Sequence, residues 1–479
     1  MPVDGRALVG GTARATKSGH EVRDPYRDQT VASVHLAGKS EVDDAVRAAH
    51  EGHIRMARTP LHERIGLFEK VIDLIGDRQE QLAEMISRQT GKAIKDSRVE
   101  VLRSQRTIRA AISAMRELRG EVVAVDASPG GEGLQALVRR EPLGVAAAIT
   151  PFNSPFNIPM HKVASALITG NAAILKPALQ APITGLQLGE VFLDAGFPPE
   201  AISVLPGGAE TGAALASAHG IDVVSFTGGV AGGNAVAREA GAKPLLLELG
   251  GNSANIVCRD ADLQVAARQL VTGAYAVAGQ TCNSVQRVIV DRAVEPDLVD
   301  LLAKLTEDLV VGDPLDEKTD IGTLIDEAAA IRVEEWINEA SRNGVEVMTD
   351  FQRNGASLTP VVLRGVTPDM RIAQDEVFGP VMAVMTADSL AESIEIANQA
   401  PFGLQASVFT RRLDNAMRAA RDLKAGGIMV NRSSKTRFDH LPFGGVKASG
   451  FGREGGSYSL EAFTYRKFVL IDAGIENGD

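Results

Sequence analysis

Apolar side chains recur every three or four residues over much of the first third of the chain. This spacing predicts long amphipathic helices. The segments that carry it are "EVDDAVRAAH" (41–50), "HERIGLFEKVIDLIGDRQEQLAEMISRQTG" (62–91) and "RVEVLRSQRTIRAAISAMRELRG" (98–120). Ser40 is a suitable residue to cap the first helix, and Gly91 and Gly120 are suitable residues to end the other two.

From residue 145 the pattern changes to short apolar runs separated by helix-like stretches. The runs are "VAAAIT" (145–150), "AAILKP" (172–177), "ISVLPG" (202–207), "VVSFTGG" (223–229) and "LLLELGG" (245–251). Strands that alternate with helices predict βαβ units and a parallel sheet covered on both faces. Ligands of such sheets bind beyond the carboxyl ends of the strands. Those ends carry "TPFN", "KPA", "PGG" and "TGG", so we expect a cofactor there.

A second region of strands and helices follows residue 251. Its strand-like runs are "SANIVC" (253–258), "VQRVIVD" (285–291), "VFGPVMAVMT" (377–386), "ASVFT" (406–410) and "GGIMVN" (426–431). The segment "FTYRKFVLID" (463–472) alternates apolar and polar residues, which predicts an exposed strand. An exposed strand needs an edge to pair with, and a partner subunit is one source of such an edge.

Composition narrows the class of protein. With 479 residues the chain is expected to form two or three packed units. It has 44% apolar and 23% charged residues, which is typical of a globular protein. The sequence contains neither a run of about 20 apolar residues nor a secretory signal. We therefore expect a cytoplasmic protein without a membrane partner. Two cysteines exclude a disulfide framework. A net charge of −11 argues against nucleic-acid binding.

Two motifs look functional but are better explained otherwise. His50 and His53 lack the spacing and the glutamate of a zinc motif, and we expect no metal. "GFGREG" (450–455) matches the dinucleotide-binding spacing, but no predicted strand precedes it and only residues 456–479 follow. A complete βαβ unit does not fit in that length, so we predict a tight glycine-rich turn.

Four polar residues stand at the predicted strand and helix ends. They are Glu248 inside the apolar run "LLLELGG", Asn153 in "TPFN", Lys176 in "ILKPA" and Cys282 in "GQTCNSVQR". Each alone has an ordinary explanation as a capping, snorkelling or small buried residue. Together they suggest covalent catalysis on a carbonyl, in which a thiolate attacks, an amide stabilises the oxyanion and a carboxylate activates water. Lys176 is better placed for cofactor hydroxyls than for activating the thiol.

Several stretches resemble one enzyme family in order and spacing over essentially the full length. They are "TPFNSPFN", "GNAAILKPA", "FTGG", "LELGGNSANIV", "GQTCNSVQR", "EVFGPV" and "PFGGVKASGFGREGG". By these motifs the chain resembles the NAD(P)-dependent aldehyde dehydrogenase superfamily. The loop "NRSSKTRFDHLPFGG" is most similar to the lactaldehyde and non-phosphorylating glyceraldehyde-phosphate branch.

The resemblance implies an α/β architecture with three parts. A Rossmann-like parallel-sheet cofactor domain would comprise residues 1–119 and 143–250, and an α/β catalytic domain residues 251–462. Residues 120–142 and 463–479 would form a small β oligomerisation flap, so that the protein would be a homodimer or homotetramer.

The resemblance also implies residue roles. Cys282 would be the nucleophile, Asn153 with the Cys282 amide the oxyanion hole, and Glu248 the base that hydrolyses the thioester formed from a thiohemiacetal. Lys176 would contact the adenosine ribose, and Glu376 with Phe378 the nicotinamide riboside. The other expected cofactor residues are Ile149, Thr150, Pro151, Phe152, Gly208, Gly212, Phe226, Thr227, Gly228, Gly229 and Leu249. Leu179 stands where NAD-preferring relatives often carry a glutamate, so the cofactor could be NAD or NADP.

The segments expected to line the aldehyde tunnel carry cations and few aromatic residues. The candidate substrate-binding residues are Arg109, Ser154, His161, Thr281, Asn283, Arg437 and His440. We therefore expect a small polar or anionic aldehyde, oxidised to the acid. The alternatives are a CoA-acylating enzyme, which the presence of Glu248 disfavours, and a broad-specificity enzyme for neutral aldehydes. A non-catalytic protein has no need of Cys282, Glu248 and Asn153 together, and no motif supports a Cys/His hydrolase.

Overall fold

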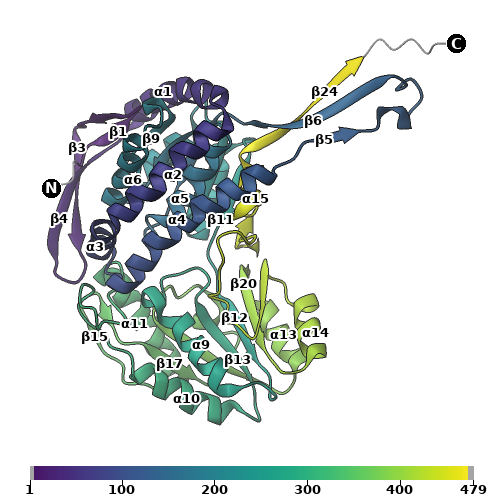
Figure 1. The fold of residues 1–479 in the computed structure, drawn as a ribbon. Helices are drawn as coiled ribbons and strands as arrows, with labels where there is room; N and C mark the ends of the chain where they lie inside the picture. Colours follow the sequence, from purple (N-terminus) through teal and green to yellow (C-terminus); the bar gives the residue numbers. More distant parts are fainter. Residues whose placement is uncertain (1–4, 473–479) are drawn as a thin grey trace.

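Two large sheets organise the chain in the computed structural model, which describes residues 5–472 (Figure 1). The first sheet has the order β2-β1-β9-β8-β7-β10-β11-β23. Its strands are β1 (Ala7–Val9), β2 (Thr12–Arg14), β7 (Val145–Ile149), β8 (Ala172–Lys176), β9 (Ile202–Val204), β10 (Val223–Thr227), β11 (Leu245–Glu248) and β23 (Gly450–Phe451). The strands from β9 to β11 are parallel, as the sequence predicts, while β1 and β23 join antiparallel at the two sides.

Helices cover both faces of this sheet, and the alternation of side chains explains why its strands are apolar throughout. Val145, Ala147 and Ile149 of β7 share a core with α1, α7 and α8, whereas Ala146 and Ala148 share a core with α2 to α6. The helices are α1 (Lys39–Arg58), α2 (Leu61–Asp77), α3 (Gln79–Thr90), α4 (Ile94–Glu117), α5 (Asn157–Ile168), α6 (Pro182–Asp194), α7 (Ala209–Ser217), α8 (Val230–Ala240) and α15 (Gly456–Ala462).

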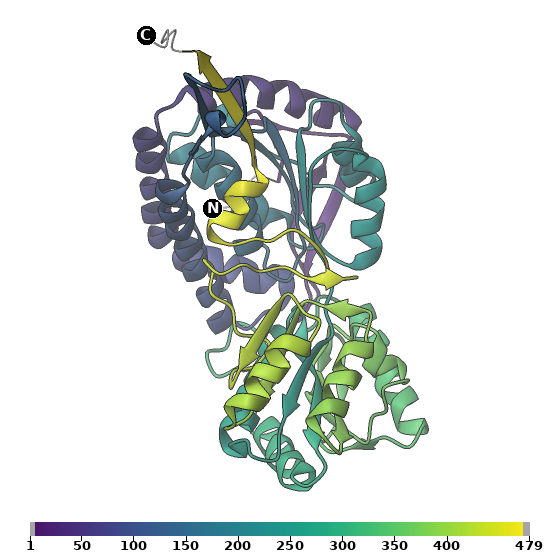
Figure 2. The same cartoon turned by 90° about the vertical axis from the view of Figure 1, so that its right-hand side faces the viewer.

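The second sheet has the order β14-β17-β18-β13-β12-β20-β21 and is also largely parallel. Its strands are β12 (Ser253–Val257), β13 (Val285–Asp291), β14 (Glu346–Val347), β17 (Val361–Arg364), β18 (Val381–Ala387), β20 (Gln405–Phe409) and β21 (Gly427–Val430). Its helices are α9 (Leu263–Tyr275), α10 (Glu295–Glu307), α11 (Glu327–Arg342), α12 (Arg371–Gln374), α13 (Leu390–Gln399) and α14 (Leu413–Asp422). The two sheets with their helices form the upper and lower lobes in Figures 1 and 2. The predicted α/β fold is confirmed.

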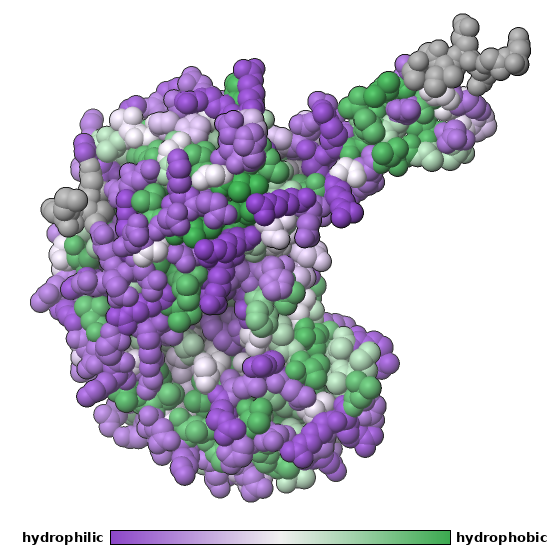
Figure 3. Space-filling view, viewed as in Figure 1, coloured by the Kyte–Doolittle hydropathy of each residue, from purple (hydrophilic) through white to green (hydrophobic). Residues whose placement is uncertain are grey.

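A three-stranded arm projects from the upper lobe (Figure 1). It consists of β5 (Glu121–Val123), β6 (Leu134–Pro142) and β24 (Thr464–Asp472), in the antiparallel order β24-β6-β5. The exposed strand predicted at 463–472 therefore exists, and within one chain its partner is β6. Apolar residues cover much of the visible face of the arm (Figure 3).

The N-terminal region differs from the sequence prediction in four details. Residues 7–36 form strands, including the hairpin β3 (Ser18–Asp24) and β4 (Gln29–Leu36). The predicted helix 62–91 is two helices, because the chain bends at Arg78. The first helix is capped at Gly38, whose amide donates to Glu41 at 2.7 Å, and not at Ser40. Gly91 ends α3 in the left-handed conformation as predicted, but α4 ends at Glu117, before Gly120.

The segment "GFGREG" is partly a strand, which corrects the prediction of a simple turn. Gly450 and Phe451 pair with β11, and the glycines at 452 and 455 then turn the chain with positive φ. Two remaining pairs of short strands, β15 (Arg353–Asn354) with β16 (Ser357–Leu358) and β19 (Phe402–Gly403) with β22 (Val446–Lys447), complete the architecture. Within residues 5–472, no helix has the length and apolar character needed to cross a membrane.

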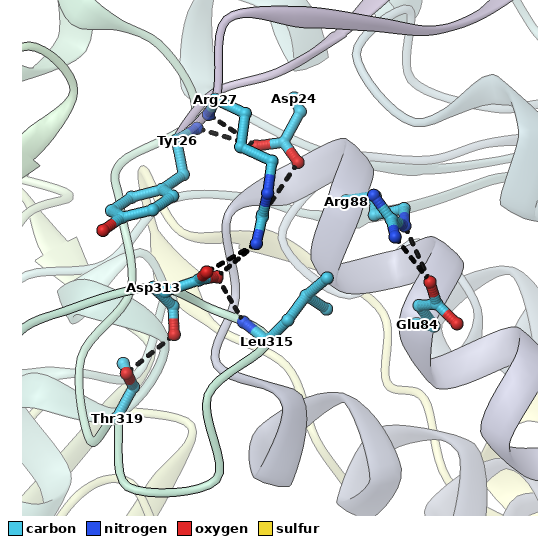
Figure 4. A network of polar contacts seen from close by, with 8 residues as sticks. All are labelled: Asp24, Tyr26, Arg27, Glu84, Arg88, Asp313, Leu315 and Thr319. Atoms are coloured by element: carbon cyan, nitrogen blue, oxygen red, sulfur yellow. Dashed lines mark hydrogen bonds and ion pairs between the residues drawn. The ribbon is translucent and has the colours of Figure 1, made fainter.

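Polar contacts hold the two lobes together near the turn between β3 and β4 (Figure 4). Arg27 donates to Asp24 in its own turn at 3.2 Å and to Asp313 of the lower lobe at 2.8 Å. Gly91 lies so close to the lower lobe that a Cβ atom there would be 1.7 Å from the Thr323 hydroxyl. This seam fixes the position of the lower lobe, and with it the cysteine loop, against the end of the first sheet.

Candidate active site

A cavity of about 240 Å³ lies where the carboxyl ends of β7, β10 and β11 meet the lower lobe. The upper lobe contributes Pro151, Phe152, Asn153, Ile158, Thr227, Gly228, Gly229, Glu248, Leu249 and Gly250, and the lower lobe contributes Cys282, Glu376 and Phe378. The three expected catalytic residues are thus brought together from segments that are distant in the sequence.

Cys282 is held in a loop with an unusual backbone. Val277, Ala278 and Gly279 are consecutive residues with positive φ, a conformation that is unfavourable for the two non-glycine residues. Gly251 allows the loop to approach β11, because a Cβ atom there would lie 2.1 Å from the Cys282 carbonyl oxygen. Burial raises the pKa of the Cys282 thiol to about 12, and Glu376 adds to this effect, whereas Arg437 and Lys435 oppose it.

Asn153 lies beside the cysteine loop. Its Nδ2 donates to the backbone carbonyl of Gln280 at 2.8 Å. Because Gln280 lies two residues before Cys282, this bond ties the Asn153 side chain to the cysteine loop. Its Oδ1 is buried and has no hydrogen-bond partner among the described residues. The hydroxyl of Thr281 is likewise buried and unpartnered.

Glu248 ends β11 with neither carboxylate oxygen hydrogen-bonded to any described residue. Burial, and next the charge of Glu454, raise its pKa well above the usual range. Glu454 itself is ion-paired with Lys162 at 2.6 Å, and Lys162 also donates to Ser225 at 2.8 Å. Burial alone would raise the pKa of Glu454, but Lys162 and neighbouring cations outweigh it and lower that pKa. Glu248 is therefore the carboxylate that can take up a proton.

The ends of β7, β8 and β10 form the surroundings expected for a cofactor. Among the described residues, the Lys176 ammonium donates only to the Pro177 carbonyl, at 3.0 Å, and burial lowers its pKa to about 8. Gly212 on α7 lies beside it, since a Cβ atom there would be 3.5 Å from the lysine side chain, an ordinary van der Waals contact. Thr150 and Thr227 have buried hydroxyls without partners among the described residues. These orphaned donors and acceptors fit a polar ligand such as a dinucleotide.

The remaining expected cofactor residues fall at the same end of the sheet. Gly208 caps α7 and Gly229 caps α8. The space around the Gly229 Cα is open, whereas a Cβ on Gly228 would lie 2.7 Å from the Phe226 ring. Ile149 is the last residue of β7. Leu179, three residues after Lys176, places no carboxylate near the ammonium.

Glu376 and Phe378 face this region from the lower lobe. Glu376 accepts from the Gly251 amide at 2.8 Å, and burial raises its pKa to about 7. A Cβ on Gly250 would lie 2.4 Å from the Glu376 carboxylate, so a larger residue there would displace that carboxylate. Phe378 has a positive φ, and its ring meets Phe152 edge to face at 5.9 Å.

Arg437 is packed against the buried polar groups next to the cavity, although it is not among the residues that line the cavity. Its Nη2 lies 3.2 Å from His161 Nε2 and 3.8 Å from Glu454, and its guanidinium lies 4.0 Å above the Phe443 ring. Its Nε is buried and has no partner among the described residues. Arg437 is close enough to Cys282 and Glu248 to lower the pKa of both.

The other expected substrate residues are more dispersed. Arg109 on α4 and His440 are exposed, and Ser154, which follows Asn153 in the chain, is half-buried. None of the seven expected substrate residues is among the residues that line the cavity. Asn283 is occupied structurally, since its amide donates to Gln405 at 2.9 Å and to the Lys435 carbonyl at 3.2 Å. His161 is buried on α5 and reaches the site through Arg437.

The sequence motifs did not single out the buried ion pairs behind the cavity. Lys162 lies in an apolar helix, and Glu454 lies in the "GFGREG" segment that was interpreted only as a turn. Asp439 is paired with Arg103 at 2.6 Å and lies 3.3 Å from His161. A lysine surrounded by apolar residues was the one available signal for the first pair.

Comparisons with known proteins agree with this geometry. The aldehyde dehydrogenase family matches residues 12–469. The 3-sulfolactaldehyde dehydrogenase of Priestia aryabhattai is 40% identical over 465 residues, covering 97% of each chain. The NADP-dependent glyceraldehyde-3-phosphate dehydrogenase of Streptococcus equinus is 35% identical over 97% of this chain and 98% of its own. The crystal structure of NADP-dependent glyceraldehyde-3-phosphate dehydrogenase from Bacillus halodurans C-125, complexed with NADP, superposes with a TM-score of 0.95 at 36% identity, covering 97% of this chain and 98% of that one. The chain belongs to the aldehyde dehydrogenase family.

Proposed function

We propose that this protein oxidises a small aldehyde with an anionic end to the corresponding acid, using NAD or NADP. The observation that carries the anionic end is Arg437, whose Nε is buried without a partner among the described residues and whose charge lowers the pKa of Cys282 and of Glu248. An arginine fork binds carboxylate, sulfonate or phosphate oxygens through parallel hydrogen bonds. The relatives named for 3-sulfolactaldehyde and glyceraldehyde-3-phosphate support this class of substrate.

The proposed chemistry assigns one task to each catalytic side chain. Cys282 loses its proton and attacks the aldehyde carbon, and the second amide hydrogen of Asn153 with the Cys282 backbone amide stabilises the oxyanion. A bound nicotinamide supplies the hydride acceptor. Glu248 takes a proton from the water that hydrolyses the thioester, a task that suits a buried carboxylate of raised pKa. The products are the acid, the reduced cofactor and a proton, and the thiol is regenerated.

We propose the end of β8 as the binding region for the adenosine part of the cofactor. Lys176 has no carboxylate within 4 Å among the described residues, and Leu179 supplies none. A 2′-phosphate would therefore meet a cation and no repulsion, which favours NADP. The solved relative with bound NADP supports this choice.

The hydrolytic reaction is favoured over acyl transfer to CoA because Glu248 lines the same cavity as Cys282.

Within residues 5–472, the proposed domain boundaries are those expected from the sequence. In addition, β23 completes the first sheet and so belongs with the cofactor domain.

We further propose a cytoplasmic homodimer or homotetramer that associates through the arm. Val122 is 80% exposed and Phe468 is 72% exposed there, and exposed apolar sheet faces mark interaction sites.

An absorbance assay for reduced cofactor tests the proposal. Aldehydes of three to four carbons with sulfonate, phosphate, carboxylate or hydroxyl ends are compared, with NAD and with NADP, in the presence and absence of CoA. We expect turnover without CoA and a higher kcat/KM for anionic ends than for the neutral one. A preference for the neutral aldehyde, or a requirement for CoA, would overturn the proposal.

A further inference from the structure

Two carboxylates on the first turns of α4 contact the two segments that carry Asn153 and Cys282. Asp96 and Glu100 are four residues apart, so both lie on the same face of the helix. Neither of them lines the cavity. The helix begins at the boundary between the lobes, where the amide of its first residue donates to the Pro314 carbonyl of the lower lobe at 2.7 Å. This face of α4 therefore reaches segments of both lobes.

Glu100 binds the segment that carries Asn153. Its Oε1 accepts from the backbone amides of Phe156 at 2.8 Å and Asn157 at 3.1 Å, three and four residues after Asn153. These amides begin α5, whose N-cap residue, Phe156, has no polar side chain to cap the helix. The other carboxylate oxygen of Glu100 is ion-paired with Lys92, and both side chains are buried. Glu100 therefore acts as a cap for α5 that another helix supplies.

Asp96 binds the segment that carries Cys282. Its Oδ2 accepts from the Val277 amide at 3.3 Å. Val277 is the first of the three consecutive residues with positive φ in the cysteine loop. Such a backbone conformation persists only when its surroundings hold it in place. Asp96, a residue of the upper lobe, is one of the contacts that hold this loop of the lower lobe.

The two segments are also joined to each other, so the contacts form a closed ring. The Gln280 amide donates to the Val277 carbonyl at 3.0 Å, and the Gln280 carbonyl accepts from Asn153 Nδ2 at 2.8 Å. Glu100 connects α4 to one end of this link, and Asp96 connects α4 to the other. Each member of the ring is therefore held from two sides, which fixes the Asn153 amide relative to the cysteine loop.

We propose that Asp96 and Glu100 are positioning residues that set the Asn153 amide against the reacting sulfur of Cys282. The inference rests on the proposed function, in which Asn153 stabilises the oxyanion. Such a donor must lie within hydrogen-bond distance of the atom on which charge develops, and a displacement of about 1 Å can lower the rate about 100-fold. Because both carboxylates act through one ring, removing either opens it, and removing the second has little further effect.

The test measures acylation of Cys282 by para-nitrophenyl acetate, a reaction that needs neither cofactor nor aldehyde. The thiolate displaces para-nitrophenolate, whose absorbance is recorded, and an acetyl thioester remains on the sulfur. The variants are Glu100→Ala, Asp96→Ala, Asn153→Ala and their pairwise combinations. Glu117→Ala, which removes an exposed carboxylate at the end of α4, is the matched control.

We expect Glu100→Ala and Asp96→Ala each to lower the acylation rate constant by about 10- to 100-fold. In the Asn153→Ala background each should lower it by less than about threefold, because the donor that they position is already absent. The double variant of the two carboxylates should be at most about threefold slower than the slower single variant. Glu117→Ala should react as the wild type does.

Two conservative variants separate positioning from a loss of folding. Asp96→Asn keeps an oxygen that can accept from the Val277 amide and should retain most of the rate. Lys92→Met/Glu100→Gln removes both buried charges, keeps an acceptor for the amides at the start of α5 and should also retain most of the rate. Thermal melting of every variant is measured in parallel. If an alanine variant does not fold, a loss above about tenfold in a folded conservative variant overturns the inference.

Losses that multiply in the Asn153→Ala background would assign Asp96 and Glu100 to stability alone and overturn the inference. Unchanged rates in both carboxylate-to-alanine variants would overturn it as well. Either result would leave the proposed function intact. If Asn153→Ala itself does not slow acylation, or if Cys282 of the wild type is not acylated, the catalytic roles in the proposed function fail first.

Discussion

Several buried polar atoms without partners lie in or near the cavity, and others lie elsewhere in the described part of the chain. The Thr150 and Thr227 hydroxyls, Asn153 Oδ1, the Glu248 carboxylate and Arg437 Nε are all of this kind among the described residues. Leaving one such group unsatisfied costs about 1–3 kcal/mol. Those in or near the cavity can be satisfied by cofactor, substrate or water, which makes them candidate binding groups.

Glu248→Gln tests the deacylation base. The amide fills the same space but cannot accept a proton from water, so the thioester should accumulate. We expect a burst of reduced cofactor of about one equivalent per active site, followed by slow turnover, in rapid-mixing absorbance measurements. Cys282→Ala should give no burst because it lacks the nucleophile. Wild-type steady-state turnover without a burst in Glu248→Gln would remove the residue from this role.

Asn153→Ala tests the oxyanion donor. Loss of one such donor lowers turnover by about 10²–10³-fold. Steady-state kinetics should show this loss in kcat, because the oxyanion forms only after attack by the thiolate. A change confined to KM would instead assign Asn153 to substrate positioning.

From the lowered pKa of Lys176 we predict that NADP binding depends on pH. Its pKa of about 8, lowered by burial, means that the side chain is charged below that pH and neutral above it. Since the 2′-phosphate stays fully charged over this range, the dissociation constant for NADP should rise about tenfold between pH 7 and pH 9.5. Fluorescence titration should show a much smaller rise for NAD, and a flat NADP profile in Lys176→Arg. Equal slopes for NAD and NADP would contradict the assignment.

Site residues at the ends of strands can be predicted from the sequence, whereas those on helix faces and in loops cannot be placed from it. Asn153, Lys176 and Glu248 were predictable because a polar residue at the end of an apolar strand has a defined place in a parallel sheet. Arg109 and His440 were named from the segments they occupy, but which way a helix or loop turns such a residue depends on packing. The pair of Lys162 and Glu454 joins positions 292 residues apart, and no local pattern records such a contact.

Gly251→Ala tests how closely the strand end and the cysteine loop approach. The added methyl group would meet the Cys282 carbonyl at 2.1 Å, so the loop must move. We expect turnover to fall at least about 100-fold and unfolding free energy to fall by about 1–3 kcal/mol, measured by assay and thermal melting. Gly66→Ala in α2, where no described residue lies within 4 Å of the new Cβ, is the control. It should leave turnover unchanged and raise the unfolding free energy by up to about 1 kcal/mol, because alanine favours a helix.

At the scale of the whole molecule, the exposed apolar residues of the arm lead us to predict that it forms the contact between subunits. Phe468→Asp places a charge on the exposed apolar face of β24 and should shift the oligomer toward smaller species in light scattering. Ile54→Asp, at a 51% exposed position on α1, is the control and should leave the mass unchanged. An unchanged mass in Phe468→Asp would exclude this face of the arm as the contact.

The arm joins strands from distant parts of the chain, since β6 ends at Pro142 and its partner β24 begins at Thr464. During synthesis the ribosome therefore releases β6 long before the strand that pairs with it, while domains fold as they emerge. The Glu454 side chain that pairs with Lys162 also arrives late. A nascent chain can thus complete neither the arm nor the buried ion pair behind the cavity until synthesis is nearly finished. A product of premature termination that lacks residues 454–472 therefore lacks both features.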